Sequence, residues 1–219
     1  MIAVAKEAGD IVQGDKTGDA PLSDIVKAYL KEKYQKPGNV FLGVVHRLDR
    51  PVSGVVLFAK TSKALPRLNK MFAEHEAVRK TYLAIVANKP PQQPEGTLVH
   101  WLTRNEKQNT ARAYDREVPN SKKAVLDYRL VAQSERYFLL EITLRTGRHH
   151  QIRCQLAKIG CPIKGDLKYG APRSNPDGSI SLHAWRLELE HPVSHVPLTI
   201  EAPLPEDRLW REFMRQHVQ

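Results

Sequence analysis

The apolar segments of this chain are short and change their period along the sequence, and this feature restricts the fold most. Alternating or continuous apolar stretches predict strands over 41–45, 54–60, 80–87 and 96–102, a hairpin over 123–145 with a turn at QSER, and a later strand pair around LHAWRLELEH and PLTIEA. Between them, apolar residues spaced three and four apart predict helices. No repeat and no regular βαβ series is present, which favours an α+β fold: a mixed, largely antiparallel central sheet with helices and loops on its faces.

Two of the expected helices have recognisable starts. The first spans 22–34, with Ser23 as its N-cap and an apolar stripe formed by Leu22, Ile25, Ala28 and Tyr29. The second follows Thr61 or Ser62, either of which can cap it. Ile152, Leu156 and Ile159 predict a third helix, which Gly160 closes, and Leu209, Trp210, Phe213 and Met214 predict a short one at the C-terminus.

Length and composition indicate an ordinary globular protein. The 219 residues fit a single domain, and 41% hydrophobic with 26% charged residues excludes a largely disordered chain. No apolar run approaches the ~20 residues that cross a bilayer, and the start MIAVAKEAGD lacks the apolar core of a secretory signal. We therefore expect a cytoplasmic protein in which Cys154 and Cys161 are free, reduced thiols.

No metal site is expected from the sequence. The nine histidines are scattered, and the adjacent His149 and His150 are expected to point to different sides of a helix. The two cysteines do not form a Cys-x-x-Cys pair.

The charge balance favours a polyanionic partner. Thirty-four Lys and Arg residues against 24 Asp and Glu residues give a net charge of +10 and a pI near 9.6. Nucleic acid is the leading candidate and an acidic membrane the second, with a solvated basic face as the alternative. The stretch 88–121, rich in Pro, Asn, Gln, Lys and Arg, is expected to form long loops around one short strand and is a candidate insertion that faces RNA.

Asp49 is the first candidate for chemistry. It lies in the polar turn HRLDRPVSG at 46–54, between two strands and between Arg47 and Arg50. Nearby positive charge keeps a carboxylate anionic, which suits a nucleophile better than a general acid. An aspartate that only caps a turn or pairs with an arginine is the alternative, and local sequence alone favours that alternative.

A second cluster comprises Arg145, Arg148 and Arg153 with His149, His150 and Gln151, at the start of the expected third helix. Arginines near free backbone N–H groups suit phosphate or carboxylate binding, and an ordinary basic face is an equal alternative. The third candidate is Tyr82 on the strand KTYLA, which can stack on a nucleobase or move a proton. A strand tyrosine is more often a core residue.

Taken in order, HRLDRPVSG, KTYLA and RTGRHHQIRCQLAKIGCPIKGDLKYG resemble the signature of the RluA-type family of RNA pseudouridine synthases. The resemblance covers roughly residues 40 to 202. It implies the pseudouridine synthase fold, a single catalytic domain over 1–219 without a separate N-terminal RNA-binding module, and a monomer that modifies ribosomal or transfer RNA without cofactor or metal.

The resemblance also implies the roles of individual residues. Asp49 is the catalytic aspartate, Arg153 is its salt-bridge partner, and Tyr82 stacks on the uracil and is a candidate to take the proton from carbon 5. Ile152 and Leu156 wall or back the site. The residues expected to bind substrate are Arg47, Arg50, Arg148, His150, Gln151 and Ile152.

Two positions depart from the family pattern. Val52 replaces the usual Thr, which removes a hydroxyl near the aspartate. Lys6-Glu7-Ala8-Gly9 replaces the common Lys-Pro-x-Gly, which leaves the N-terminal turn less well defined.

Two other functions compete with this interpretation. A catalytically silent RNA-binding protein on the same fold would not need Asp49, Tyr82 and Arg153 together. A sugar or nucleoside hydrolase ordinarily needs two carboxylates flanking the bond, and the HRLD region offers one.

Overall fold

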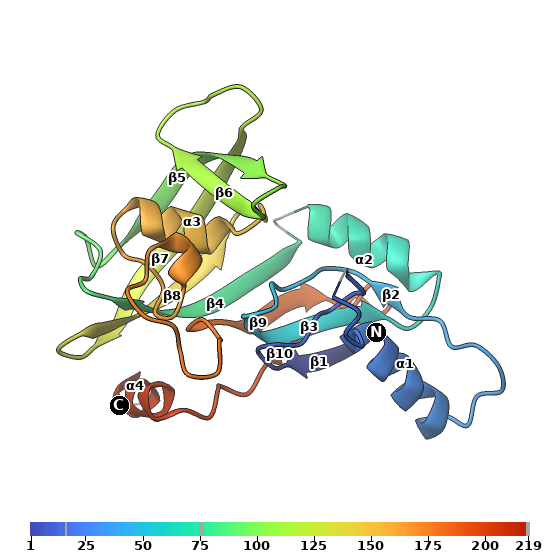
Figure 1. The fold of residues 1–219 in the computed structure, drawn as a ribbon. Coiled ribbons are helices and arrows are strands. Elements are labelled where there is room, and N and C mark those ends of the chain that lie inside the picture. Colours follow the sequence, from blue (N-terminus) through green and yellow to red (C-terminus); the bar gives the residue numbers. More distant parts are fainter. Residues whose placement is uncertain (16, 75–76, 218–219) are drawn as a thin grey trace. The chain divides into compact units, whose positions relative to one another are not determined.

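The computed structural model describes residues 1–15, 17–74 and 77–217. The chain forms two compact units, each built from two segments (Figure 1). The first unit comprises Met1–Val78 and Ala184–Pro203, and the second comprises Arg79–His183 and Leu204–Gln219. The single catalytic domain expected over residues 1–219 stays a prediction.

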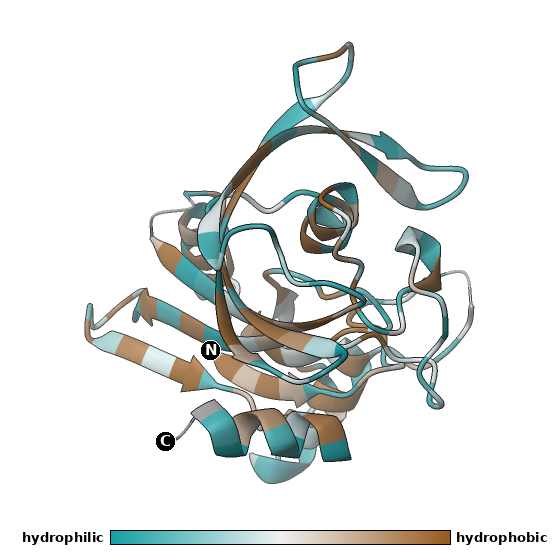
Figure 2. Ribbon diagram, turned by 90° about the vertical axis from the view of Figure 1, so that its left-hand side faces the viewer, coloured by the Kyte–Doolittle hydropathy of each residue, from teal (hydrophilic) through white to brown (hydrophobic). Residues whose placement is uncertain are grey.

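Within the described residues, strands outnumber helices. The strands are β1 (Ile2–Lys6), β2 (Gly43–Val44), β3 (Ser53–Ala59), β4 (Val78–Ala87), β5 (Glu95–Asn105), β6 (Thr110–Tyr114), β7 (Lys122–Gln133), β8 (Tyr137–Leu144), β9 (Leu182–Glu190) and β10 (Pro197–Glu201). The helices are α1 (Leu22–Lys33), α2 (Ala64–Ala73), α3 (Gln151–Lys158), α4 (Arg208–His217) and the 3₁₀ helix η1 (Leu167–Tyr169). Hydrophilic residues dominate the loops, and hydrophobic residues gather on the strands (Figure 2).

The first unit is built around β3, whose seven residues SGVVLFA are all buried. β3 lies between β1 and β9 in the sheet, β2 also pairs with β3, and β10 pairs with β9. The pairings of β3 with β1 and with β2, and of β9 with β10, are antiparallel. Most of the core of this unit comes from three elements, Val55, Leu57 and Ala59 of β3, Leu68 and Phe72 of α2, and Leu187 and Leu189 of β9, and Val78 and Ala202 complete it.

Helix α1 is where the sequence predicted, but its buried face differs. Leu22, Val26 and Leu30 are buried, at spacings of four residues, whereas Ile25 and Tyr29 are 54% and 48% exposed. The predicted cap was also wrong: Ser23 is buried inside the first turn, and the backbone oxygen of Pro21 accepts the N–H of Asp24 at 2.9 Å.

The second helix starts as predicted. Thr61 Oγ1 accepts a hydrogen bond of 3.1 Å from the backbone N–H of Ala64, the first residue of α2. This bond satisfies one of the N–H groups that every helix N-terminus leaves without a partner inside the helix.

The second unit carries an antiparallel sheet with the strand order β4-β8-β7-β5-β6. The predicted hairpin is confirmed as β7 and β8, and its turn is closed by the N–H of Ser134 donating to the oxygen of Tyr137 at 2.8 Å. The strand predicted over 96–102 is confirmed within β5, but the expectation of long loops around it was wrong in part, because β5 extends to 11 residues and β6 adds a further strand of 5. That this stretch faces RNA stays a prediction.

Helix α3 contacts both β5 and β6, and six of its eight residues are buried, from Gln151 to Leu156. It ends at Lys158, ahead of Gly160, whose φ of +78° suits a residue that stops a helix. Cys154 on this helix and Cys161 after it are free, as predicted, and both are buried.

The predicted α+β class with a largely antiparallel sheet is confirmed. Among the described residues, no helix is both long and apolar enough to span a bilayer.

Candidate active site

In the first unit, the segment His46–Arg50, here called the HRLDR loop, joins β2 to β3 and is held from the N-terminal side of the chain. Lys6 Nζ donates to the backbone oxygens of Arg50 at 3.1 Å and of Val52 at 2.6 Å. The backbone N–H of Gly9 donates to the same oxygen of Arg50 at 2.8 Å. The stretch Lys6 to Gly9, although it lacks the family's proline, therefore forms a turn that fixes the end of this loop.

Lys6 is the site residue that sequence reasoning missed in this unit. Its side chain is 1% exposed, and burial lowers its pKa to about 8, while the carboxylates of Asp10 and Asp49 act to raise it. The available indication was a lone lysine at the end of an apolar strand, in the place of the family's Lys-Pro-x-Gly. A buried ammonium group surrounded by carbonyl oxygens is a positioning group, because each of its N–H bonds fixes a backbone segment.

Asp49 lies half-buried at the turn, between two buried residues that anchor the loop, Leu48 and Val52. Its backbone oxygen accepts the N–H of Val52 at 3.0 Å, which closes the turn. The side chain of Val52 is 2% exposed, so the position where the family has Thr is filled by core packing here.

Gly54, the last residue of the HRLDRPVSG motif, is required by a close backbone approach. Its φ is +128°, and a Cβ atom at this position would lie 2.3 Å from the backbone oxygen of Ala184. No other residue fits there without moving β3 away from β9, so this glycine fixes where the strand after Asp49 begins.

The two arginines that flank Asp49 in sequence have different surroundings. The guanidinium of Arg50 donates to Asp19 at 2.5 Å and to Thr17 Oγ1 at 2.9 Å, and the bond with Asp19 raises its pKa. Arg47 is exposed and makes no hydrogen bond or ion pair with the described residues. Both were predicted to bind substrate, and that role stays a prediction for each.

In the second unit, Tyr82 is the fifth residue of β4 and is half-buried. It pairs with Ile142 of β8, and the residues around it on β4, from Leu83 to Ala87, are buried. The strand is therefore a rigid support for the ring, which is what a stacking residue needs.

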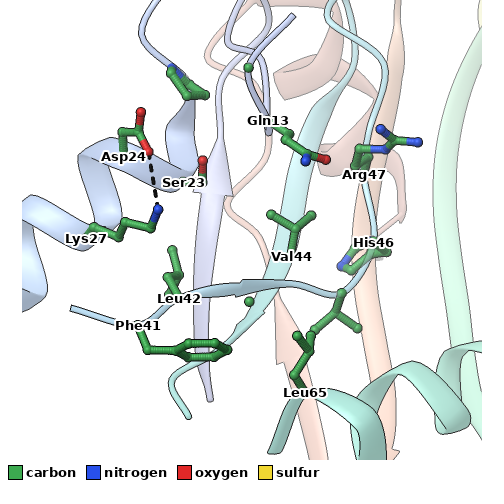
Figure 3. Close-up of a pocket in the computed structure, with 14 residues that line it drawn as sticks. Gln13, Ser23, Asp24, Lys27, Phe41, Leu42, Val44, His46, Arg47 and Leu65 are labelled. Carbon is green, nitrogen blue, oxygen red and sulfur yellow. Dashed lines mark ion pairs between the residues drawn. The ribbon is translucent and has the colours of Figure 1, made fainter. Parts of the chain in front are cut away.

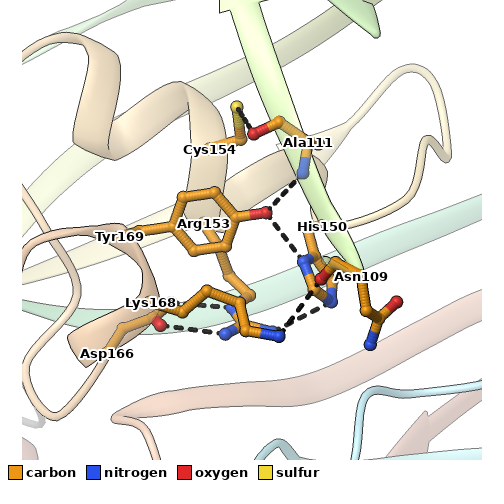
Figure 4. A network of polar contacts seen from close by, with 8 residues as sticks. All are labelled: Asn109, Ala111, His150, Arg153, Cys154, Asp166, Lys168 and Tyr169. Atoms are coloured by element: carbon orange, nitrogen blue, oxygen red, sulfur yellow. Dashed lines mark hydrogen bonds and ion pairs between the residues drawn. The ribbon is translucent and has the colours of Figure 1, made fainter. Parts of the chain in front are cut away.

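The guanidinium of Arg153, on α3, forms a buried two-pronged ion pair with Asp166. Nε lies 2.7 Å from Oδ2 and Nη2 lies 2.8 Å from Oδ1, and the two residues are 5% and 1% exposed. Figure 4 shows this pair together with the ring of Tyr169, whose centroid lies 5.1 Å from the guanidinium carbon. Sequence reasoning missed Asp166, and the predicted pairing of Arg153 with Asp49, a residue of the first unit, stays a prediction.

His150 continues the same network and has a fixed protonation state. Its Nε2 lies 3.1 Å from Nη1 of Arg153, which can only donate, so Nε2 accepts and the imidazole is neutral. Its Nδ1 then donates to the hydroxyl oxygen of Tyr169 at 2.7 Å, which also accepts the N–H of Ala111 at 2.8 Å. Burial, followed by the positive charge of Arg153, lowers the pKa of His150 to about 2.

The two adjacent histidines do not separate across a helix as predicted. Both precede α3, whose first residue is Gln151, and His150 has a left-handed backbone with φ of 50°. The rings of His149 and His150 are stacked, with their centroids 3.8 Å apart.

Gln151 is buried, and its amide joins residues 145–148, here called the RTGR segment, to β7. Its Oε1 accepts from Thr146 Oγ1 at 2.8 Å and from the N–H of Arg148 at 2.9 Å, and its Nε2 donates to the oxygen of Val125 at 3.1 Å. The guanidinium of Arg148 donates to the oxygen of Lys123 at 3.0 Å, so it too is tied to β7. These contacts fix the loop before α3.

The remaining predicted wall residues, Ile152 and Leu156, are 4% and 0% exposed on α3. The predicted substrate contacts of Arg148, His150, Gln151 and Ile152 stay predictions.

The neutral state of His150 predicts a pH dependence of stability. Unfolded, this histidine takes a proton below about pH 6.5, whereas folded it stays neutral down to about pH 2. Its contribution is therefore present above pH 6.5, and the free energy of unfolding falls as the pH drops below that value, by about 1.4 kcal/mol per pH unit.

Replacing His150 with glutamine, which keeps one acceptor and one donor, should remove this slope. Urea unfolding at pH 7, 6 and 5 measures it, and the difference between wild type and His150→Gln isolates this residue from the other histidines. Identical slopes for the two proteins would show that His150 is protonated in the folded state.

The amino-acid sequence of this chain is similar to those of known proteins. The family model described as RNA pseudouridylate synthase matches residues 1–158. The chain is 34% identical over 218 residues to a ribosomal large subunit pseudouridine synthase D of Nitrosomonas europaea, covering 94% of this chain and 60% of that protein. It is 36% identical over 189 residues to a tRNA pseudouridine synthase C of Salmonella typhi, covering 78% of this chain and 70% of that protein.

A solved structure shares the fold. The human RNA pseudouridylate synthase domain containing 4 superposes with a TM-score of 0.77 at 22% sequence identity, covering 99% of this chain and 89% of that one.

Proposed function

Because this chain belongs to the RNA pseudouridylate synthase family, we propose that it isomerises uridine to pseudouridine in ribosomal or transfer RNA. The match over residues 1–158, which includes the HRLDR loop and the RTGR segment, carries the proposal. The two RNA classes are those named for the relatives from Nitrosomonas europaea and Salmonella typhi. The resemblance to the RluA-type family predicted from the three motifs is confirmed.

In this proposal Asp49 acts on the target uridine while its N-glycosidic bond is cut. The freed base rotates within the site, carbon 5 bonds to the ribose, the proton of carbon 5 leaves, and N1 gains a proton, so the reaction is a balanced isomerisation. Tyr82 stacks on the uracil and is the candidate to take the carbon 5 proton, and Arg153 supports the negative charge of Asp49.

The fixed position of the turn that carries Asp49 supports a catalytic role for this residue. Its turn is fixed at three points, by the side chain of Lys6, the backbone of Gly9 and the tight approach of Gly54 to Ala184. A nucleophile acts efficiently only when its position is set before the substrate arrives, because a loose carboxylate loses the benefit of orientation.

The substrate must be unstacked before this chemistry. Flipping a base out of structured RNA costs a few kcal/mol, and phosphate contacts from a chain of net charge +10 help to offset that cost. Arg47, exposed beside Asp49 in sequence, is a candidate to contact the RNA next to the target uridine. We further propose that the protein works in the cytoplasm, as a monomer and without metal or cofactor.

Pseudouridine mapping tests this function. Purified protein is incubated with unmodified ribosomal and transfer RNA, and total RNA is compared between cells with and without the gene. New pseudouridine in vitro, matched by its loss at the same positions in cells without the gene, supports the proposal. RNA binding without pseudouridine in either experiment would indicate a catalytically silent RNA-binding protein.

The positive charge predicts that RNA affinity depends steeply on salt. Each phosphate neutralised on a single-stranded segment lowers log K by about 0.7 per tenfold rise in salt concentration, because condensed counterions are released on binding. Filter binding over a series of KCl concentrations measures the slope. A slope near zero would contradict the assignment of the basic surface to phosphate contacts.

A further inference from the structure

A groove of about 730 Å³ lies within the first unit, lined in part by His46 and Arg47 of the HRLDR loop. Half-buried Val44 and Val45 and the side chain of Leu65 from α2 form its aliphatic surface. Gly43 belongs to the same lining, and a Cβ atom there would come within 2.7 Å of Leu65 Cδ1. The groove is therefore defined by tightly packed backbone and aliphatic side chains beside the proposed catalytic loop.

The rest of the lining is aromatic and polar. Phe41 is 42% exposed, so part of its ring is available for contact with a ligand. Figure 3 shows Phe41 at one end of the groove and the side chains of Gln13 and Arg47 at the other. Lys27 Nζ, also in the lining, lies 3.6 Å from the carboxylate of Asp24.

The charges indicate which kind of molecule fits. Arg50 has its charge balanced by Asp19, whereas Arg47 is exposed without a hydrogen bond or ion pair among the described residues. An apolar partner would leave the Arg47 guanidinium without a counter-charge. A nucleotide can contact the aromatic, amide and guanidinium groups of the lining, since a base stacks on an aromatic surface, an amide bonds its edge, and an arginine binds phosphate.

We propose that this groove binds one unpaired nucleotide of the RNA substrate next to the target uridine, with its base on Phe41 and its phosphate at Arg47. The inference rests on the proposed function, because Arg47 and Asp49 are two residues apart and the same RNA strand then serves both. Phe41 and Gln13 would thereby be residues that bind substrate, outside the three motifs.

Two substitutions separate the stacking part from the charged part. Phe41→Ala should weaken binding of a 12-nucleotide single-stranded RNA by about five- to hundredfold without changing the salt slope, because stacking releases no counterion. Arg47→Gln should lower that slope by about 0.7, the contribution of one phosphate. Phe41→Trp should restore the affinity that Phe41→Ala loses.

Matched controls lie on the same unit outside the groove. Tyr29 is a 48% exposed aromatic residue of α1, and Arg67 is an exposed arginine of α2. Tyr29→Ala should leave affinity unchanged and Arg67→Gln should leave the slope unchanged. Thermal melts check that Phe41→Ala, which removes an exposed ring, folds as the wild type does.

Crosslinking locates the base directly. The same RNA, with 5-iodouridine at successive positions, is irradiated with the protein, and mass spectrometry should find the crosslinked residue in the peptide that carries Phe41. Wild-type affinity in Phe41→Ala, or crosslinks confined to peptides outside the groove, would overturn the inference.

The binding and activity measurements together distinguish failure of the proposed function from failure of the groove proposal. If Phe41→Ala weakens RNA binding while the wild type forms no pseudouridine, the groove stands and the proposed activity falls. If the wild type forms pseudouridine and Phe41→Ala binds RNA normally, the activity stands and the groove proposal falls.

Discussion

Replacing Asp49 with asparagine should abolish pseudouridine formation, with a loss of about ten-thousandfold or more in rate, and leave RNA affinity within a few-fold of wild type. The change is nearly isosteric, so the turn closed by the backbone of Asp49 and Val52 persists. The amide carries no charge and is a poor nucleophile, so the chemical step is lost. Single-turnover pseudouridine formation measures the rate, and filter binding measures the affinity.

The control for this prediction is Asp10→Asn. Asp10 is the other aspartate whose charge acts on buried Lys6, so both substitutions remove one negative charge from the surroundings of that lysine. Asp10→Asn should keep near wild-type turnover, because nothing assigns that carboxylate to the chemistry. Turnover by Asp49→Asn close to the wild-type rate would refute the catalytic role of Asp49.

The strands of the fold were predictable where burial alone fixes the pattern. β3 is buried along its whole length, and the β7 and β8 hairpin alternates between faces, so hydrophobicity carries both. The ends of β5 and the whole of β6 were less predictable. The residues that extend β5 beyond 96–102 are polar, and β6 (TARAY) is short, so both depend on the pairing of β5 with β7 and of β6 with β5, which supplies backbone hydrogen bonds that composition does not encode.

Helix α1 shows a different limit of the sequence pattern. Ile25 and Tyr29 have the same spacing of four residues as Val26 and Leu30, so two neighbouring stripes are equally amphipathic. Only packing within the first unit decides that Val26 and Leu30 are buried. Spacing therefore predicts the helix without selecting its inner face.

The site was predictable to the extent that its residues lie in contiguous motifs. Asp49, Tyr82 and Arg153 stand out in this way, whereas the contacts around them do not follow from the order of residues. Lys6 contacts a backbone oxygen 46 residues away, and Asp166 lies in the same motif as Arg153, 13 residues further on, without any feature that marks it as the partner of that arginine. Such partners are set by tertiary folding, so a single sequence without geometry does not reveal them.

Arg153→Ala should destabilise the protein by about 3–5 kcal/mol, because it leaves the carboxylate of Asp166 buried without its partner. The pair is bidentate, and Asp166 is 1% exposed. The same change removes the donor that holds His150 neutral. Urea unfolding at pH 7 measures the loss, and a change below about 1 kcal/mol would mean that water or another group compensates the carboxylate.

Arg153→Lys is the conservative variant. It keeps the positive charge and loses the fork that matches both oxygens of Asp166, so it should recover stability better than rate. A purely structural arginine would give parallel recovery of both.

Double-mutant cycles decide whether Arg153 interacts with the carboxylate of Asp166, of Asp49 or of both. In the Asp166→Ala background, Arg153→Ala should cost much less than it does in the wild type, since the orphaned charge is already gone, and strict additivity would contradict the ion pair. In the Asp49→Ala background, the predicted pairing with Asp49 requires a double mutant more stable than the two single losses imply. Additivity in that second cycle, together with strong coupling in the first, would restrict Arg153 to positioning α3 through Asp166. Lys6, on whose pKa the charge of Asp49 acts against the effect of burial, would then be the first candidate for a cation that interacts with Asp49.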